Sequence, residues 1–344
     1  MFVGNRQQRG RETLAHYRHR VGTPRSEFMN AIRIHSYGGP EVLQYEDAHC
    51  PRVKNGEVLV RVHAAGVNPL DWKVRGGDLN GFVEHKLPLI PGWDLSGVVE
   101  KVGPGPAAAG RFKKGDEVFA MADPTRDGAY ADYVAVREAE LAIKPKSLHH
   151  VYAAATPVSA LAAWQSLFGA GKLQPGQRIL IHGGSGGVGH FAVQFAKWKG
   201  AYVIATASTN NQQLLRKLGA DETIDYTIQK FEDVAQKIDI VLDTIGGETQ
   251  ERSWLVLKQG GALISLVQPP SEEKVNQFGV RSIMSSVQPD GAQLSAIAKL
   301  IDSAKLRPTI DRILPLSEAR RAHELSQNGH TRGKIVLRVK DVQS

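Results

Sequence analysis

The sequence contains a single cysteine, Cys50, among 344 residues. One thiol cannot form a disulfide within the chain, and it cannot supply the several thiolates of a cysteine-based zinc site, so both kinds of scaffold are excluded. Such sparse cysteine fits a reducing compartment, and we expect a cytoplasmic location. The chain also lacks any apolar run near the ~20 residues that a membrane helix requires, so we expect no membrane partner.

Acidic residues are scarce at the amino terminus. Residues 1–28 contain six arginines and only Glu12 and Glu27, so this segment carries half of the net charge of +8. It has neither the apolar stretch of a secretory signal nor a periodic apolar face. We expect a disordered basic extension over residues 1–29, or translation assigned from a start upstream of Met29. The alternative is a nucleic-acid or membrane contact, or an organellar targeting segment. The remaining charge is modest and does not argue for a nucleic-acid partner.

Short strands separated by glycine and proline characterise residues 30–152. Residues 57–62 (EVLVRV) alternate polar and apolar side chains, which places Val58, Val60 and Val62 on one face. Residues 95–102, 116–120 and 131–136 show similar short β patterns, with turn signals such as Pro91-Gly92 between them. These features predict a small domain of the β-barrel type.

Strands and helices alternate from residue 153 onward. A helical pattern over 153–168 precedes a strand at 178–181, a helix at 187–199, a strand at 202–206, a helix at 212–218 and strands at 238–243 and 262–266. Such alternation predicts an α/β domain with a doubly wound parallel sheet, which we place at residues 153–315. A helix at 317–327 and a strand at 334–339 are expected to return to the first domain, which then comprises residues 30–152 and 316–344.

A glycine-rich turn joins the first strand of this sheet to its helix. Gly184, Gly186 and Gly189 have the spacing G-x-G-x-x-G within residues 178–189 (RILIHGGSGGVG). The first glycine permits a tight turn, the second lets the backbone approach a pyrophosphate, and the third lets the helix pack on the strand. The helix N-terminus adds free N–H groups and the positive end of its dipole. With a strand before it and a helix after it, the turn predicts a dinucleotide site.

No carboxylate follows the second strand of the sheet. NAD-binding sites usually carry Asp or Glu there to bond the ribose 2′-hydroxyl, whereas this chain reads ATASTN over residues 205–210. Ser208, Thr209 and Asn210 can donate hydrogen bonds to a 2′-phosphate, and Arg216 or Lys217 follows nearby. The pattern favours NADP(H) over NAD(H).

Four segments resemble the zinc-free quinone-oxidoreductase branch of the medium-chain dehydrogenase/reductase family. They are residues 64–73 (AAGVNPLDWK), 88–97 (PLIPGWDLSG), the glycine turn and 239–247 (DIVLDTIGG), and the likeness covers residues 30–340 in order. The resemblance implies a GroES-like substrate domain of the β-barrel type built from both chain ends, and a Rossmann domain between them. It also implies a homodimer and a cleft between the domains that holds the nicotinamide.

The resemblance further implies that no metal is needed. Zinc-dependent relatives place Cys where this chain has Asn68, and a His-Glu pair where it has Trp93-Asp94. Indole cannot ligate zinc, and an Asn amide is a poor ligand beside the Cys, His and carboxylate groups normally used. The four-cysteine structural lobe of those relatives is also missing, so we expect no metal site.

Individual roles follow from the same resemblance. The expected catalytic residues are Asn68, facing the nicotinamide or the substrate carbonyl, and Lys73, which is either a lysine of the cleft or a solvated surface lysine. Tyr226 is either a cofactor contact or a packed aromatic. The expected cofactor contacts are Asn68; Gly184, Ser185, Gly186, Gly187, Val188 and Gly189 at the pyrophosphate; Ser208 and Tyr226 at the 2′-phosphate and adenosine; Thr244, Ile245, Gly246 and Leu266 beside the nicotinamide ribose; and Arg332 and Lys334, where a cation can reach the 2′-phosphate.

One position departs from the family. Many relatives have a threonine against the nicotinamide where this chain has Ala162, and the hydroxyl of Ser159 or Thr156 is the substitute to consider. The expected reaction is hydride transfer from NADPH to a quinone or an α,β-unsaturated carbonyl. Such an acceptor spreads the incoming charge onto oxygen, so the protein needs only to orient it and donate one or two hydrogen bonds. An NADPH-binding redox sensor or nucleic-acid-binding protein without robust catalysis is the alternative.

Overall fold

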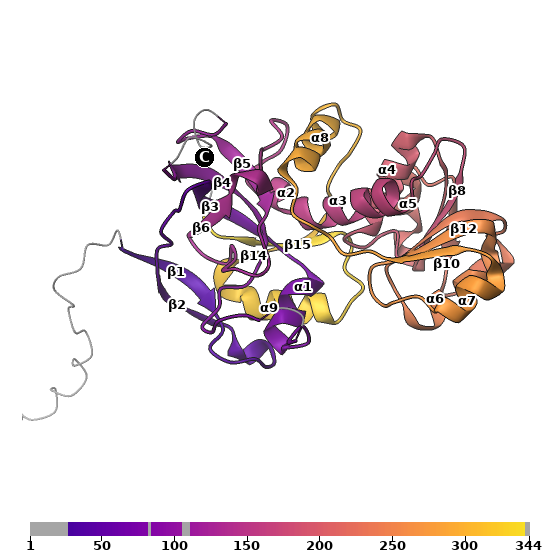
Figure 1. Cartoon of the computed structure of the whole chain (residues 1–344), viewed down its shortest axis with the longest axis horizontal. Helices are drawn as coiled ribbons and strands as arrows, with labels where there is room; N and C mark the ends of the chain where they lie inside the picture. Colours follow the sequence, from indigo (N-terminus) through magenta and orange to yellow (C-terminus); the bar gives the residue numbers. More distant parts are fainter. Residues whose placement is uncertain (1–26, 82–83, 105–110, 341–344) are drawn as a thin grey trace, which may run out of the picture.

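The structure, a computed structural model, describes residues 27–81, 84–104 and 111–340. Two lobes lie side by side, one built from both ends of the chain and one from its middle (Figure 1). The alternatives considered for the basic extension concern residues 1–26, which lie outside the described residues. Within the described ranges, no helix is long and apolar enough to cross a membrane.

The part of the first lobe that the structure describes is built on a seven-stranded sheet. Its order is β14-β15-β3-β4-β5-β7, with β6 paired to β3. All neighbours are antiparallel except β14 and β15. A separate antiparallel pair joins β1 (Phe28–Arg33) to β2 (Gln44–His49). The strands of the larger sheet are β3 (Glu57–Val67), β4 (Asp94–Val102), β5 (Glu117–Met121), β6 (Tyr133–Arg137), β7 (Leu141–Ile143), β14 (Ile310–Pro315) and β15 (Lys334–Arg338).

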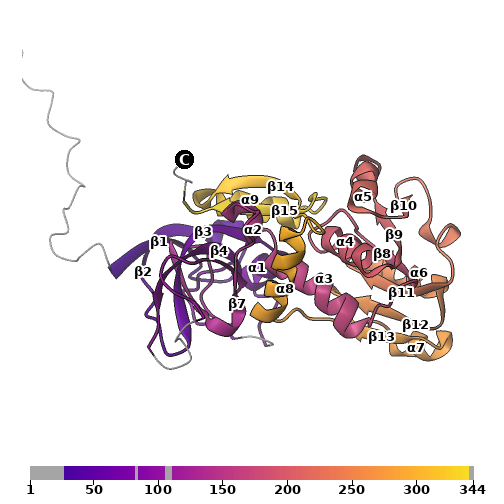
Figure 2. The same cartoon turned by 90° about the horizontal axis from the view of Figure 1, so that it is seen from above.

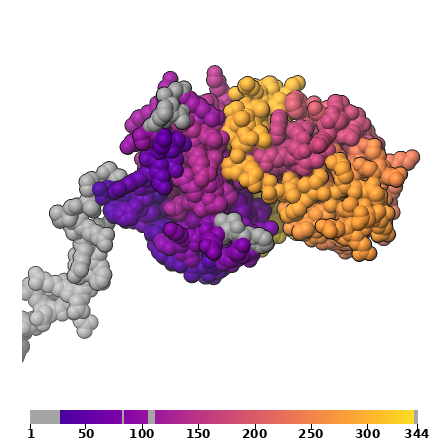
Figure 3. Space-filling model, viewed as in Figure 1, coloured from indigo at the N-terminus to yellow at the C-terminus, as the bar shows by residue number. Residues whose placement is uncertain are grey.

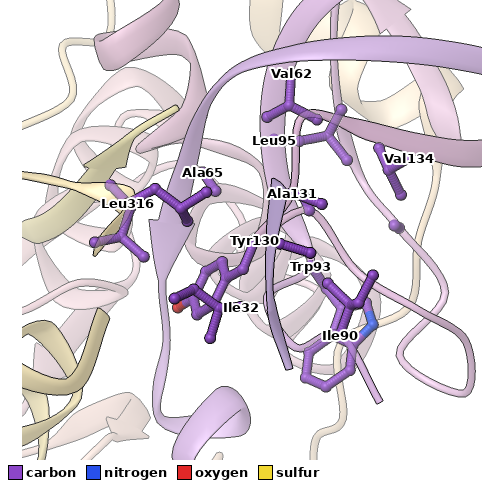
Figure 4. Close-up of a cluster of buried hydrophobic side chains, with 14 of the residues drawn as sticks. Ile32, Val62, Ala65, Ile90, Trp93, Leu95, Tyr130, Ala131, Val134 and Leu316 are labelled. Carbon is purple, nitrogen blue, oxygen red and sulfur yellow. The ribbon is translucent and has the colours of Figure 1, made fainter. Parts of the chain in front are cut away.

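One hydrophobic core fills this lobe. Val58, Val60 and Val62 are fully buried, as the alternation of residues 57–62 predicted. Trp93 and Tyr130 are the largest side chains there and lie among smaller aliphatic residues (Figure 4). The indole Nε1 of Trp93 donates to the carbonyl oxygen of Arg126 at 2.9 Å, so its buried N–H is satisfied. Trp93 therefore serves the core.

The second lobe contains a six-stranded parallel sheet in the order β10-β9-β8-β11-β12-β13, counted over the described residues. Its strands are β8 (Arg178–Ile181), β9 (Tyr202–Ala207), β10 (Glu222–Asp225), β11 (Ile238–Asp243), β12 (Leu257–Ser265) and β13 (Arg281–Met284). The chain order reverses between β8 and β11. In an open parallel sheet a ligand binds at such a reversal, outside the carboxyl ends of the strands.

Helices cover both faces of the parallel sheet, because its central strands are apolar on both sides. Ile179 and Ile181 of β8 pack in the core that includes α4, whereas Leu180 between them faces a second core on the other side. α4 lies beside β8 and β9, and α5 lies beside β9 and β10 (Figure 2). The helices are α1 (Pro69–Gly76), α2 (His150–Ala154), α3 (Pro157–Trp164), α4 (Gly189–Lys199), α5 (Gln212–Leu218), α6 (Gly247–Ser253), α7 (Glu272–Phe278), α8 (Gly291–Asp302) and α9 (Ala319–Gln327).

Several boundaries differ from the sequence prediction. β14 hydrogen-bonds to β15 in the first sheet, so residues 310–315 join the barrel lobe although we had placed them in the Rossmann domain. β1 begins at Phe28, so the extension expected over residues 1–29 overlaps the fold at Phe28 and Met29. α4 begins at Gly189, two residues later than expected, because residues 182–188 form a turn.

The two lobes are joined closely. α8 belongs to the middle of the chain yet lies at the junction (Figure 3). Its first residue, Gly291, approaches the backbone of β7 so closely that a Cβ atom there would lie 2.3 Å from the carbonyl oxygen of Leu141. Val158 in α3 bonds to Asp94 in β4, so the barrel and the Rossmann domain also share a buried hydrogen bond.

Candidate active site

The glycine turn lies at the carboxyl end of β8, beside the point where the strand order reverses. The motif predicts the tight turn at Gly184, but the left-handed conformation lies one residue earlier, at Gly183, which has φ +65°. A Cβ atom on Gly184 would lie 2.9 Å from Leu215 Cδ2, and one on Gly189 would lie 2.1 Å from Gly183 O. A Cβ atom on Gly186 would meet only Gly183 O, at 3.3 Å. Gly184 and Gly189 therefore serve packing, while the backbone at Gly186 stays open to a ligand.

Backbone donors of the turn remain free for such a ligand. Among the described residues, the N–H groups of Ser185, Gly187 and Val188 have no hydrogen-bond acceptor. They lie just before α4, where the positive end of the helix dipole adds to their attraction for an anion. These free N–H groups fit a pyrophosphate, and they are an observation independent of the sequence motif.

His190 holds this turn in place, and the sequence analysis did not identify it. Its Nδ1 donates to Gly186 O at 2.9 Å, and its Nε2 accepts the N–H of Thr309 at 3.2 Å. Burial lowers the pKa of His190 to about 4, so the ring is neutral at pH 7. A histidine one residue after a glycine motif carries no signal of this role, because the partner at Thr309 is distant in sequence.

The end of β9 presents hydroxyl and amide groups, as predicted. Ser208 is half-buried and accepts from Asn211 Nδ2 at 3.2 Å, while Thr209 and Asn210 are exposed. The neighbouring strand brings one carboxylate there that the sequence argument did not include, because Asp225 of β10 pairs with Ala207 of β9. Its Oδ1 accepts from the backbone and hydroxyl of Thr227, and hydroxyl bonds lower its pKa. Asp225 is buried, and its Oδ1 is occupied by the two donors of Thr227.

Tyr226 follows directly and is 50% exposed. A hollow of about 490 Å³ opens beside it, lined also by Ile228, Lys230, Phe231 and Arg252. The exposed ring and adjoining hollow offer a surface for a flat aromatic group at the carboxyl end of the sheet. Of the two roles considered for Tyr226, the packed aromatic does not fit a half-exposed ring, and the cofactor contact stays a prediction.

The loop after β11 is fixed by the buried carboxylate of Asp243. Its Oδ1 accepts the N–H groups of Ile245 and Gly246 at 3.0 and 2.8 Å. Thr244 Oγ1 donates to His182 O at 2.8 Å, which draws this loop against the strand end preceding the glycine turn. Leu266 follows on the neighbouring strand, and its N–H donates to Asp243 O at 3.0 Å. Thr244, Ile245, Gly246 and Leu266 therefore lie together beside the turn.

Asn68, Asp94 and Lys334 form a buried hydrogen-bonded cluster, here called the buried polar set. Asp94 is 0% exposed, and Asn68 and Lys334 are each 3% exposed. Lys334 Nζ donates to Asn68 Oδ1 and, at 3.0 Å, to Asp94 Oδ2. Asn68 Nδ2 donates to the same Asp94 oxygen at 2.8 Å. The N–H of Val158 donates to Asp94 Oδ1 at 2.6 Å, so the set reaches from the barrel to the first helix of the Rossmann lobe.

The buried polar set corrects one sequence expectation. A cation of the stretch that holds Arg332 and Lys334 was expected to reach a 2′-phosphate, but the ammonium of Lys334 is buried against Asn68 and Asp94. Its stem does lie at the glycine turn, since a Cβ atom on Gly187 would lie 3.4 Å from Lys334 Cδ. The N–H of Gly333 also donates to Ser185 O at 2.8 Å. The family resemblance placed this stretch near the glycine turn, but it could not reveal which acceptor the ammonium would find.

Lys73 and Arg332 lie apart from the buried polar set among the contacts of the described residues. Lys73 is half-buried on α1, with its Nζ 5.8 Å from the ring centroid of Trp72. Arg332 is exposed, two residues before Lys334. The candidate hydroxyls near Ala162 are also separated: Thr156 donates back to Tyr152 O, whereas Ser159 Oγ lies 3.3 Å from the position of a Cβ atom on Gly187. Of these two hydroxyls, that of Ser159 lies next to the glycine turn.

A second buried layer supports Asn68. Asp71 Oδ2 accepts the N–H of Asn68 at 2.8 Å and the hydroxyl of Tyr130 at 2.8 Å. Burial raises the pKa of Asp71 to about 7, against these hydrogen bonds, which lower it. Burial and the neighbouring Asp71 raise the pKa of Tyr130 well above its usual value, so its hydroxyl stays a donor. Asp71 and Tyr130 therefore fix the backbone from which the Asn68 amide projects.

The donor set at this position does not fit zinc. Zinc requires lone pairs from thiolate, imidazole or carboxylate groups, usually at least three of them from the protein. Here Lys334 places an ammonium against both Asn68 and Asp94, and an ammonium repels a metal ion. Within the described ranges, no group of three or more His, Cys, Asp and Glu side chains is arranged to hold a metal.

Two protein families and several curated proteins match the chain. Residues 54–146 match the family described as alcohol dehydrogenase GroES-like domain, and residues 218–337 match the family described as zinc-binding dehydrogenase. The chain is 33% identical to the mitochondrial NAD(P)H oxidoreductase RTN4IP1 of Danio rerio, over 95% of this chain and 96% of the relative. It is 36% identical to the chloroplastic NADPH-dependent alkenal/one oxidoreductase of Arabidopsis thaliana, over 90% and 79%.

Solved structures of similar proteins superpose on most of this chain. The quinone oxidoreductase of Coxiella burnetii superposes with a TM-score of 0.83 at 35% identity, covering 91% of this chain and all of that one. The mycobacterial protein Rv1454c, solved with NADPH, superposes with a TM-score of 0.81 at 28% identity, covering 90% of this chain and all of that one. The predicted combination of a GroES-like and a Rossmann domain is confirmed.

The relatives also overturn one expectation. We expected a cytoplasmic location from the sparse cysteine, but the relatives are named as mitochondrial or chloroplastic proteins. The cytoplasmic assignment is therefore wrong on this comparison. Its reasoning failed because several reducing compartments besides the cytoplasm hold proteins poor in disulfides.

Proposed function

Because the chain belongs to the quinone-oxidoreductase branch of the medium-chain dehydrogenase/reductase family, we propose that it transfers hydride from NADPH to a quinone or an α,β-unsaturated carbonyl without zinc. Membership makes it an NAD(P)H oxidoreductase with a small-molecule substrate. The choice of NADPH, the acceptor class and the independence from zinc are the proposal.

The buried polar set is the observation that carries the proposal. The charge of Lys334 stands between Asn68 and Asp94, where zinc-dependent relatives have ligand residues. Without a metal to ionise it, a simple alcohol is a poor hydride donor. A quinone or conjugated carbonyl avoids this difficulty, because the negative charge produced by hydride addition spreads onto an oxygen. The site then has to bind that oxygen rather than activate an alcohol.

When bound, NADPH supplies the hydride. The free N–H groups of Ser185, Gly187 and Val188 would hold its pyrophosphate, and the loop at Thr244–Gly246 would flank the ribose beside the nicotinamide. Asn68 would donate an N–H to the acceptor's oxygen, as hydrogen-bond donors do in oxyanion holes. Lys73 remains a proposed second donor, reached from α1. Water supplies the final proton, since the described contacts assign no side chain to that step.

Several features support NADPH over NADH. Ser208, Thr209 and Asn210 follow β9 with no carboxylate among them, and an exposed carboxylate there would repel a 2′-phosphate. Asp225 lies close by, but it is buried, and its Oδ1 already accepts the N–H and the hydroxyl of Thr227. The relative from Arabidopsis thaliana is named as NADPH-dependent, and Rv1454c was solved with NADPH.

The proposal is tested by following oxidation of NADPH and NADH with 1,4-benzoquinone, 9,10-phenanthrenequinone and a small enone, beside oxidation of a plain alcohol with NADP⁺. We expect turnover of at least one quinone or enone with NADPH and none of the alcohol. Turnover of the alcohol alone would refute the acceptor class, and equal affinity for NADPH and NADH in calorimetric titrations would refute the choice of cofactor. We also propose a homodimer, which light scattering of the purified protein tests.

A further inference from the structure

We propose that Lys334 is a positioning residue that holds the Asn68 amide as a hydrogen-bond donor for the acceptor's oxygen. The inference rests on the proposed function, because it assigns Asn68 to the oxygen that gains charge. It goes beyond that function by giving Lys334 a role in hydride acceptance rather than in binding the 2′-phosphate.

The chemistry of the two partners determines the orientation of the Asn68 amide. An ammonium has only donors, and a carboxylate has only acceptors. The amide carbonyl must therefore face Lys334, and the amide NH₂ must face Asp94. Turning the amide over would oppose NH₂ to ammonium and carbonyl to carboxylate, which removes two buried hydrogen bonds and creates two repulsions. Neither Lys334 nor Asp94 alone would exclude the turned-over amide as strongly as both do together.

The fixed orientation leaves one amide hydrogen for a ligand. Asn68 Nδ2 carries two hydrogens, and Asp94 Oδ2 accepts one of them. Among the described residues, Asp94 is the acceptor to which Nδ2 hydrogen-bonds. Donation from Lys334 to the amide carbonyl also polarises the amide, which strengthens the remaining N–H as a donor. Asn68 thus has one free and activated donor.

The position of Lys334 couples this donor to the cofactor site. Its stem lies against Gly187, and the preceding residue, Gly333, donates to Ser185 O at 2.8 Å. Ser159 meets the same glycine from α3. The side chain of Lys334 therefore runs from the glycine turn to Asn68, between the proposed pyrophosphate site and the proposed acceptor site. A lysine that only bound the 2′-phosphate would have to reach the end of β9 instead.

Substitution of Lys334 alone would leave Asp94 buried without its counter-charge, so the test uses a paired change. In Lys334→Met with Asp94→Asn, both charges are lost, and residue 94 keeps an oxygen for the N–H of Val158. Lys334→Arg retains a donor-only cation. Lys258→Met with Asp239→Asn is the control at a more exposed pair, because Asp239 also pairs with a lysine and also accepts a backbone N–H, from Arg178 at 2.8 Å. Asp239 lies at the start of β11, away from the carboxyl ends that form the site.

Steady-state kinetics with NADPH and 9,10-phenanthrenequinone give the first readout. We expect the Lys334→Met, Asp94→Asn protein to lose about 10²–10³-fold in kcat, the loss typical of an oxyanion donor. Its Kd for NADPH should stay within about threefold, which is under 1 kcal/mol. Lys334→Arg should keep most of the wild-type kcat, and the control pair should have the kcat and the Kd of the wild type. An unchanged kcat with weaker binding of NADPH, but not of NADH, would overturn the inference and restore the 2′-phosphate role.

A second readout does not depend on turnover. The 4-nitrophenolate anion, bound in the presence of NADP⁺, mimics the charged oxygen of the acceptor, and its absorbance reports binding. We expect the wild-type protein and Lys334→Arg to bind it about tenfold or more tightly than the paired variant. Equal affinity, or no measurable binding to the wild type, would overturn the role of Lys334. If phenolate binding follows Lys334 while no quinone or enone is reduced, the proposed function fails and the donor role stands.

Discussion

Replacement of Lys334 by methionine keeps the length of the side chain but removes its charge. Asp94 would then keep the N–H of Val158 and the Asn68 amide as donors, at 2.6 and 2.8 Å, and would lose its ion pair with Lys334. Breaking a buried ion pair by removing one partner costs about 3–5 kcal/mol. For a domain of about 150–250 residues this corresponds to a fall in Tm of roughly 6–20 °C.

Thermal unfolding followed by circular dichroism measures this fall. Adding Asp94→Asn should restore most of the stability at pH 8. A Tm within about 2 °C of the wild type, or no recovery of stability when Asp94→Asn is added, would refute the view that Lys334 and Asp94 form a buried ion pair.

Three further predictions concern the cofactor site and its support. Gly189→Ala should prevent stable folding, because its Cβ atom would lie 2.1 Å from Gly183 O. Gly186→Ala should fold but should weaken NADPH binding about tenfold or more in calorimetric titration. A folded Gly189→Ala protein with normal affinity for NADPH would contradict this view of the turn. Ser208→Glu should reduce the preference for NADPH over NADH by about tenfold or more, and an unchanged preference would show that the end of β9 does not meet the 2′-phosphate. Burial lowers the pKa of His190 from 6.5 to about 4. The neutral ring therefore contributes fully to the stability of the fold above pH 6.5, and this contribution is lost as the pH falls toward 4. Urea unfolding of His190→Gln should therefore show a shallower loss of stability between pH 7 and 5 than the wild type shows. Asp71→Asn should show a steeper loss, because burial raises the pKa of Asp71 to about 7, and this carboxyl therefore adds stability as the pH falls. Slopes equal to that of the wild type would contradict both assignments.

Much of the fold could be predicted because its signals are local. The strands at 178–181 and 238–243 and the helix at 212–218 have the bounds expected from sequence, since apolar periodicity and glycine stops mark them. β14 was assigned to the wrong lobe because its short sequence, IDRILP, does not indicate its partner. Only the pairing with β15 places it in the barrel.

The site was partly predictable for the same reason. The glycine turn and the carboxylate-free end of β9 are contiguous in sequence, so their chemistry could be inferred directly. The buried polar set joins residues 68, 94 and 334, and the partner of a lysine ammonium cannot be deduced from its neighbours in the chain. His190 and Asp225 were missed likewise, because their importance depends on Thr309 and on the register between β9 and β10.

Turnover after metal removal tests the central claim most directly. The purified protein would be dialysed against 1,10-phenanthroline, its zinc content measured by atomic absorption, and its oxidation of NADPH followed with 9,10-phenanthrenequinone and a small enone. We predict that turnover is unchanged by chelation and is not raised by added Zn²⁺, because Lys334 places an ammonium between Asn68 and Asp94. Loss of turnover on chelation, with recovery on addition of Zn²⁺, would contradict the account.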